Sequence, residues 1–244
     1  MTGPSIAELR AATQPASIFE RDSGEHWAGK LYIRKASPYL TRLLLRTPIT
    51  PNGVTWLMIL TGVAAAGVLA LPGVLAAAGA VLLIQLQILL DCSDGELARW
   101  RNVRSPTGVY LDRVGHWVTE TLLPIALGIR ADEPLLGLVV AVLVLWIKGE
   151  SALVTVARAE SGLPPAADTQ AVAAPRAGIL ARARRALRRL PFYRAFVAME
   201  FTLLALVASF FDDGSRVLVI ALIPVAAITV LGHGVAILTS GRLR

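Results

Sequence analysis

The 244-residue chain is poor in charge and almost devoid of cysteine. Only 17% of its residues are charged and 55% are apolar, whereas a soluble domain carries about 25% charge. This composition argues against a soluble globular domain and against a disordered chain. The one cysteine, Cys92, cannot form an intrachain disulfide, which excludes a disulfide scaffold and fits a reducing compartment.

A secretory signal and internal repeats are missing as well. Residues 1–30 are mixed and polar without a continuous apolar core, so no cleavable signal peptide is expected. What the chain has instead is long apolar runs, and its mean hydropathy is +0.61. These features indicate an integral membrane protein. Six spans of about 20 residues would use roughly half of the chain, which leaves no room for a second folded domain.

Six apolar runs predict six transmembrane helices, so the expected fold is an all-α integral membrane protein. The predicted spans cover residues 54–71, 74–90, 109–129, 134–156, 192–211 and 217–238. A Leu-Pro-Gly turn joins the first two into a helical hairpin. Lys148, Glu150 and Glu200 fall inside later spans. Such groups indicate a polar cavity, or they pair with one another between helices.

Arginine and lysine outside the spans are biased to one side of the membrane. Only Arg130 and Arg216 lie on the poorer side, and the rest flank the other ends of the spans. The positive-inside rule therefore places both termini and the loops 91–108 and 159–191 in the cytoplasm, for an inner or plasma membrane. The net charge of +7 reflects this orientation rather than a nucleic-acid partner.

The chain is predicted to have a polar tail, residues 1–28, and one six-helix membrane domain, residues 29–240. Within residues 29–48, apolar and basic residues are spaced as in an amphipathic helix that lies in the membrane surface. The cytoplasmic loop 159–191 contains a segment, 179–190, with the pattern of a basic amphipathic helix. That helix would rest against anionic lipid or help to hold an anionic substrate.

Four groups that can bind a metal lie at the cytoplasmic ends of the second and third predicted spans. Asp91 and Asp94 are spaced i, i+3, and Asp112 and His116 are spaced i, i+4, so each pair shares one helix face. Close carboxylates repel one another and are costly to bury near lipid. A divalent cation removes both costs, and a cluster of oxygen ligands suits Mg²⁺ or Mn²⁺.

Small residues and one arginine adjoin these groups. Gly95 and Ala98 leave space beside the metal, and Gly108 permits another backbone to approach closely. Arg99 offers a planar fork of donors for a phosphate. The pattern therefore predicts a diphosphate held by metal at the membrane surface.

This stretch resembles the signature of the CDP-alcohol phosphotransferase family, also called the CDP-alcohol phosphatidyltransferase family: D-x2-D-G-x2-A-R-x8-G-x3-D-x3-D. Seven of its eight defined positions are matched, by Asp91, Asp94, Gly95, Ala98, Arg99, Gly108 and Asp112. The resemblance implies a six-span fold with cytoplasmic termini and a possible homodimer. It also implies transfer of a substituted phosphate group from a CDP-linked donor to an alcohol, with release of CMP.

Roles for these residues follow from the resemblance. The aspartates would hold one or two metal ions, and Gly95, Ala98, Arg99 and Gly108 would line the nucleotide pocket. The usual donor is CDP-diacylglycerol, and the acceptor is a polar alcohol or alcohol phosphate. A donor such as CDP-inositol is the alternative. Arg158 and Arg194 would contact an acceptor phosphate or serve only as membrane anchors.

The chain departs from the signature at His116, where the family has a fourth aspartate. His116 would be the base that activates the acceptor hydroxyl, with Glu120 at i+4 orienting its ring. It would otherwise be a nitrogen ligand in a changed metal site, or a sign of lost activity. Lost activity would leave a membrane scaffold or binding protein. An intramembrane prenyltransferase would need a second Asp-rich motif and more spans, and the sequence has neither.

Overall fold

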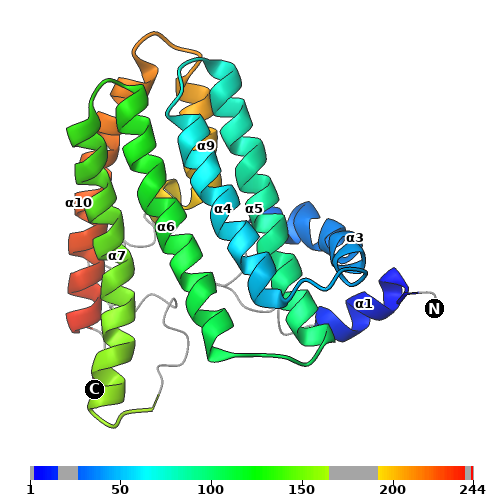
Figure 1. Cartoon of the computed structure of the whole chain (residues 1–244). Helices are drawn as coiled ribbons and strands as arrows, with labels where there is room; N and C mark the ends of the chain where they lie inside the picture. The colour runs from blue at the N-terminus through cyan, green and yellow to red at the C-terminus, as the bar shows by residue number, and fades with distance from the viewer. Residues whose placement is uncertain (1–2, 16–26, 165–191, 240–242, 244) are drawn as a thin grey trace. The chain divides into compact units, whose positions relative to one another are not determined.

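Figure 1 shows the computed structural model, which describes residues 3–15, 27–164, 192–239 and 243. Every regular element in these residues is a helix, which confirms the all-α class. In chain order the elements are α1 (Ile6–Thr13), the π-helical η1 (Gly29–Ile33), α3 (Arg34–Leu44), α4 (Pro51–Leu69), α5 (Val74–Trp100), α6 (Pro106–Arg130), α7 (Pro134–Glu160), the 3-10 helix η2 (Phe192–Phe196), α9 (Ala198–Ala208) and α10 (Gly214–Thr239).

Four of the helices are long and apolar enough to cross a membrane, namely α4, α5, α7 and α10. Helix α6 has 25 residues, but its first 15 residues carry Asp112, Arg113, His116 and Glu120. Where the sequence predicts one span over 192–211, the structure has η2 followed by the 11-residue α9. Val197 separates them because its backbone is extended, and α9 alone is about 16 Å long against a hydrocarbon core of about 30 Å.

The described chain forms two compact units. The first comprises residues 1–67 and 79–119, and its core joins α4 to α5 through Val54, Met58 and Leu97. Helix α6 packs against α4 where Gly115 has no side chain. A Cβ at Gly115 would lie 2.2 Å from Met58 Cε, so glycine permits this close approach.

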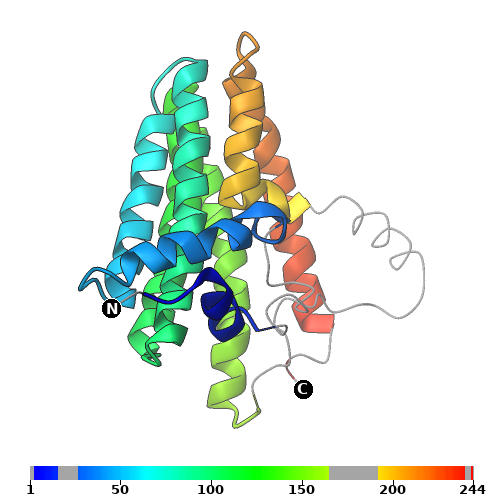
Figure 2. The ribbon, with the colours of Figure 1, turned by 90° about the vertical axis from the view of Figure 1, so that its right-hand side faces the viewer.

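The N-terminal helices belong to the same unit. Helix α3 crosses α4 and α5 at a steep angle, and α1 lies beside α3 (Figure 2). The predicted helix in residues 29–48 is thus present, but its faces differ from those of a simple interfacial helix. Ser37 and Thr41 are fully buried, whereas Tyr39 and Leu43 are exposed. The inward face of α3 is therefore partly polar.

The second unit comprises residues 68–78 and 120–244. Helices α7 and α10 pack along one another in it (Figure 1). Helices α6 and α7 meet backbone to backbone, since a Cβ at Gly128 would lie 2.7 Å from Gly137 Cα. The ionisable residues inside these helices form pairs: Lys148 Nζ contacts Glu120, and His233 Nδ1 lies 2.8 Å from Glu150 Oε2.

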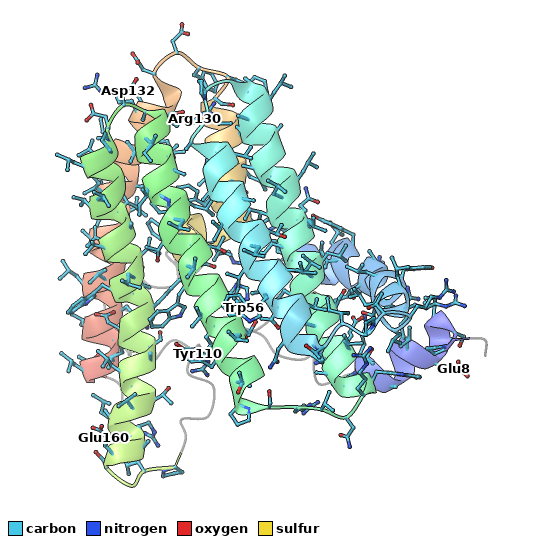
Figure 3. The ribbon with its side chains drawn as sticks, in the orientation of Figure 1. Glu8, Trp56, Tyr110, Arg130, Asp132 and Glu160 are labelled. Atoms are coloured by element: carbon cyan, nitrogen blue, oxygen red, sulfur yellow. The ribbon has the colours of Figure 1, made fainter. Side chains whose placement is uncertain are left out.

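Arg130 closes the turn between α4 and α5 at one end of the second unit (Figure 3). Its guanidinium donates to the carbonyl oxygens of Leu71 and, at 2.9 Å, Gly73, and to Ser215 Oγ at 3.2 Å. Leu71 follows the end of α4, and the Gly73 carbonyl oxygen also accepts from Ala77 N at 3.4 Å. The arginine therefore links this turn to α6 and α10.

Arg130→Ala should therefore lower the free energy of unfolding by about 2 kcal/mol, because hydrogen bonds to charged groups are lost. The measurement is the midpoint of thermal unfolding in detergent. Arg216→Ala is the matched control, since Arg216 pairs with Glu133 and its side chain is 57% exposed. Such a pair is worth at most about 1 kcal/mol. Equal midpoints for the two variants would contradict the structural role of Arg130.

Candidate metal and nucleotide site

Helix α5 continues ten residues beyond the predicted end of its span, from residue 90 to Trp100. The segment from Asp91 to Arg99 is therefore helical throughout. Asp91 and Asp94 share one face of it, as their spacing predicts. The first turns of α6 then bring Asp112 and His116 opposite this face.

Asp91, Asp112 and His116 come together at one place. His116 Nε2 lies 3.3 Å from Asp91 Oδ1 and 3.6 Å from Asp112 Oδ1. One ligand atom from each of the three lies within 4.8 Å of the others. The side chains of Asp91, Asp112 and His116 are 28%, 45% and 40% exposed, so the cluster is accessible to a ligand.

The three donors fit a divalent cation. Two carboxylate oxygens supply negative charge, and the imidazole adds a nitrogen that Mn²⁺ or Zn²⁺ accepts more readily than Mg²⁺ does. Three protein ligands leave further coordination positions for phosphate oxygens. His116 contacts Asp91 and Asp112, whereas Glu120, which was expected to orient its ring, is paired with Lys148.

Asp94 is held differently from the other acids. It is 8% exposed, and Thr55 Oγ1 of α4 donates a hydrogen bond of 2.6 Å to its Oδ2. Thr55 is itself buried, so this contact fixes the carboxylate from the side of α4. Local spacing does not predict this contact, because Thr55 and Asp94 are 39 positions apart.

Arg99 lies over the glycine that precedes it by one helical turn. A Cβ at Gly95 would lie 3.1 Å from Arg99 Nη1 and 3.3 Å from Nη2. Arg99 Nε donates to the carbonyl oxygen of Thr13 at 2.6 Å.

The other two residues predicted to line the nucleotide pocket are Ala98 and Gly108. Ala98 is half-buried on α5. Gly108 lies close to the start of α4, because a Cβ there would be 3.1 Å from Asn52 Oδ1.

The two arginines predicted to contact the acceptor lie in the second unit. Arg158 is in the last turn of α7, and its Nε donates to the carbonyl oxygen of Pro164 at 2.9 Å. Arg194 is in η2. Their acceptor roles stay predictions. The predicted basic helix 179–190 lies outside the described residues.

Comparison with known proteins adds an independent finding. Residues 48–168 match the family model described as CDP-alcohol phosphatidyltransferase. The matched segment contains Asp91, Asp94, Gly95, Ala98, Arg99, Gly108, Asp112 and His116. The comparison with curated proteins found no match. The family match and the cluster on α5 and α6 together place this chain in the CDP-alcohol phosphatidyltransferase family.

Proposed function

We propose that the protein is a metal-dependent transferase that moves a substituted phosphate group from a CDP-linked donor to a polar alcohol and releases CMP. Family membership implies phosphoester transfer from a CDP-alcohol in lipid synthesis. The observation that carries the finer proposal is the convergence of Asp91, Asp112 and His116 within 4.8 Å, inside the family segment.

Asp91, Asp112 and His116 would hold the cation, with Asp94 beside them. When bound, a divalent cation neutralises phosphate charge and polarises the phosphoryl group. His116 serves as a ligand in this proposal, because its Nε2 lies between the two carboxylates that would share the ion. Mn²⁺ or Mg²⁺ is the expected cofactor.

The residues of the chain then position the donor and move one proton. Arg99 binds a phosphate of the diphosphate through Nη1 and Nη2, since its Nε is engaged by Thr13. The acceptor oxygen forms a bond to phosphorus as the bond from phosphorus to the CMP oxygen breaks. The hydroxyl proton passes to the carboxylate of Asp112, the most exposed of the three ligands.

The proposal includes a membrane arrangement. Helix α6, and η2 together with α9, complete six spans over residues 29–240. Both termini and the site lie in the cytoplasm, because arginine and lysine are concentrated on that side. The donor is CDP-diacylglycerol, whose acyl chains remain in the bilayer. CDP-inositol is the alternative donor. A homodimer is expected from the family resemblance.

The test is CMP release by the purified protein in nanodiscs with Mg²⁺ or Mn²⁺. CDP-diacylglycerol is offered with glycerol phosphate, inositol phosphate, serine or inositol as acceptor. CMP release that requires both the metal and one acceptor supports the proposal and identifies the acceptor. If CMP is released only when CDP-inositol is offered, CDP-inositol is the donor in place of CDP-diacylglycerol. Protein that binds neither CDP nor metal would support the scaffold alternative instead.

A further inference from the structure

Glu96 is a buried acid that the proposed chemistry does not use. Its side chain is completely buried, although it lies only two residues after Asp94. Two residues turn an α-helix by about 200°, so Glu96 points away from the metal-binding face. A carboxylate without partners in such a place would cost several kcal/mol, so its partners indicate its purpose.

Within the described ranges, the side chains that hydrogen-bond to Glu96 lie on α3 or at the end of α1. Ser37 Oγ and Gln14 Nε2 donate to its Oε1 at 2.5 and 2.8 Å, and Thr41 Oγ1 donates to its Oε2 at 2.7 Å. Ser37 and Thr41 lie on α3, and Gln14 caps the C-terminal end of α1. One buried carboxylate thus fastens both helices to α5.

The same end of α1 contacts Arg99. The carbonyl oxygen of Thr13, next to Gln14, accepts a hydrogen bond from Arg99 Nε at 2.6 Å. The last carbonyls of a helix lack intrahelical partners and carry partial negative charge, so they attract a guanidinium. Because Nε is held there, Nη1 and Nη2 lie over Gly95, towards the expected position of the nucleotide.

We propose that helix α1 is part of the nucleotide site: Glu96 fastens α1 and α3 to α5, and the fastened α1 orients Arg99 for the donor diphosphate. Glu96 is thus a positioning residue. The inference rests on the proposed function for its nucleotide, but the fastening of α1 can be measured without one. It adds α1 and α3, which precede the family segment 48–168, to the surroundings of Arg99.

The experiment compares wild-type protein with Glu96→Ala and with the double variant Ser37→Ala/Thr41→Val, which leaves α5 unchanged. Three quantities are measured in nanodiscs: amide hydrogen exchange of residues 6–13, the dissociation constant for Mn²⁺ alone, and that for CDP in the presence of Mn²⁺. We expect faster exchange in α1 and about 10-fold weaker CDP binding, as when a supporting contact is lost. Mn²⁺ binding alone should stay within about 2-fold of wild type, because the ligands on the other face are undisturbed.

Tyr32→Phe is the matched control. Tyr32 Oη donates to Gln85 Oε1 at 2.9 Å, which is another contact between the N-terminal region and α5. It lies about 16 Å along the helix from Glu96, so its loss should leave CDP binding unchanged.

Several results would overturn the inference. Unchanged exchange in both Glu96→Ala and the double variant would show that Glu96 does not fasten α1. Faster exchange with unchanged CDP affinity would show that α1 does not orient Arg99. Equal weakening of Mn²⁺ and CDP binding would show that α1 has no specific effect on the nucleotide. Wild-type protein that fails to bind CDP would instead refute the proposed function, and the orienting role with it, while the exchange data still decide the fastening.

Discussion

Asp112→Asn is expected to reduce metal-dependent CMP release by about 10³-fold. The substitution keeps the shape of the side chain but removes a negative charge from the cluster with Asp91 and His116. A metal ion contributes several kcal/mol to charge stabilisation during phosphoryl transfer, and 4 kcal/mol corresponds to about 10³-fold in rate. The variant also loses the carboxylate that we propose as the proton acceptor. The measurements are CMP release and the dissociation constant for Mn²⁺.

Asp132→Asn is the matched control for this substitution. Asp132 is exposed in the turn between α6 and α7, and its φ of 55° is a conformation that asparagine also adopts. This variant should retain wild-type CMP release and Mn²⁺ affinity. Normal turnover of Asp112→Asn, measured beside it, would refute the assignment of the site.

His116→Asp is expected to change which metal supports the reaction. The substitution replaces the imidazole nitrogen by an oxygen and completes the four-aspartate signature of the family. Carboxylates suit Mg²⁺, whereas imidazole favours Mn²⁺ or Zn²⁺. We expect the ratio of the Mg²⁺ to the Mn²⁺ affinity to rise by about 10-fold or more, with the activity ratio changing in the same direction.

His116→Ala separates the ligand role from the role of a general base. A lost ligand should weaken Mn²⁺ binding as well as slow CMP release. A lost base should slow CMP release while metal affinity stays the same. Reduced turnover with unchanged Mn²⁺ affinity in His116→Ala would therefore transfer the base role to His116. His233→Ala is the control, because His233 pairs with Glu150 in the other unit.

Local spacing was enough to predict much of the cluster. The i, i+3 and i, i+4 pairs on neighbouring helices predicted that Asp91, Asp112 and His116 can approach one another. The structure brings these three residues together.

Hydropathy was less informative about helix ends. It placed the end of a span at residue 90, although α5 continues to Trp100, because polar residues can extend a helix beyond its apolar part.

Local sequence patterns do not predict contacts between residues that are far apart in the chain. Gln14 and Glu96 are 82 positions apart, and nothing in either neighbourhood indicates their hydrogen bond. The pairing of His233 with Glu150, 83 positions apart, was missed for the same reason. Helix α1, in contrast, has a local sequence signal at its start. Ser5 and Glu8 form a capping box, the Ser-x-x-Glu pattern that begins many helices.

The most direct test of the central claim is pulsed electron paramagnetic resonance of Mn²⁺ bound to the protein together with CDP. The claim is that one cation is held by Asp91, Asp112 and His116 and also contacts the donor diphosphate. It predicts hyperfine coupling from one imidazole nitrogen and from phosphorus in the same spectrum. The nitrogen coupling should disappear in His116→Ala, and Mn²⁺ binding should be lost in Asp112→Asn. Bound Mn²⁺ without phosphorus coupling, or a nitrogen coupling that survives in His116→Ala, would contradict the account.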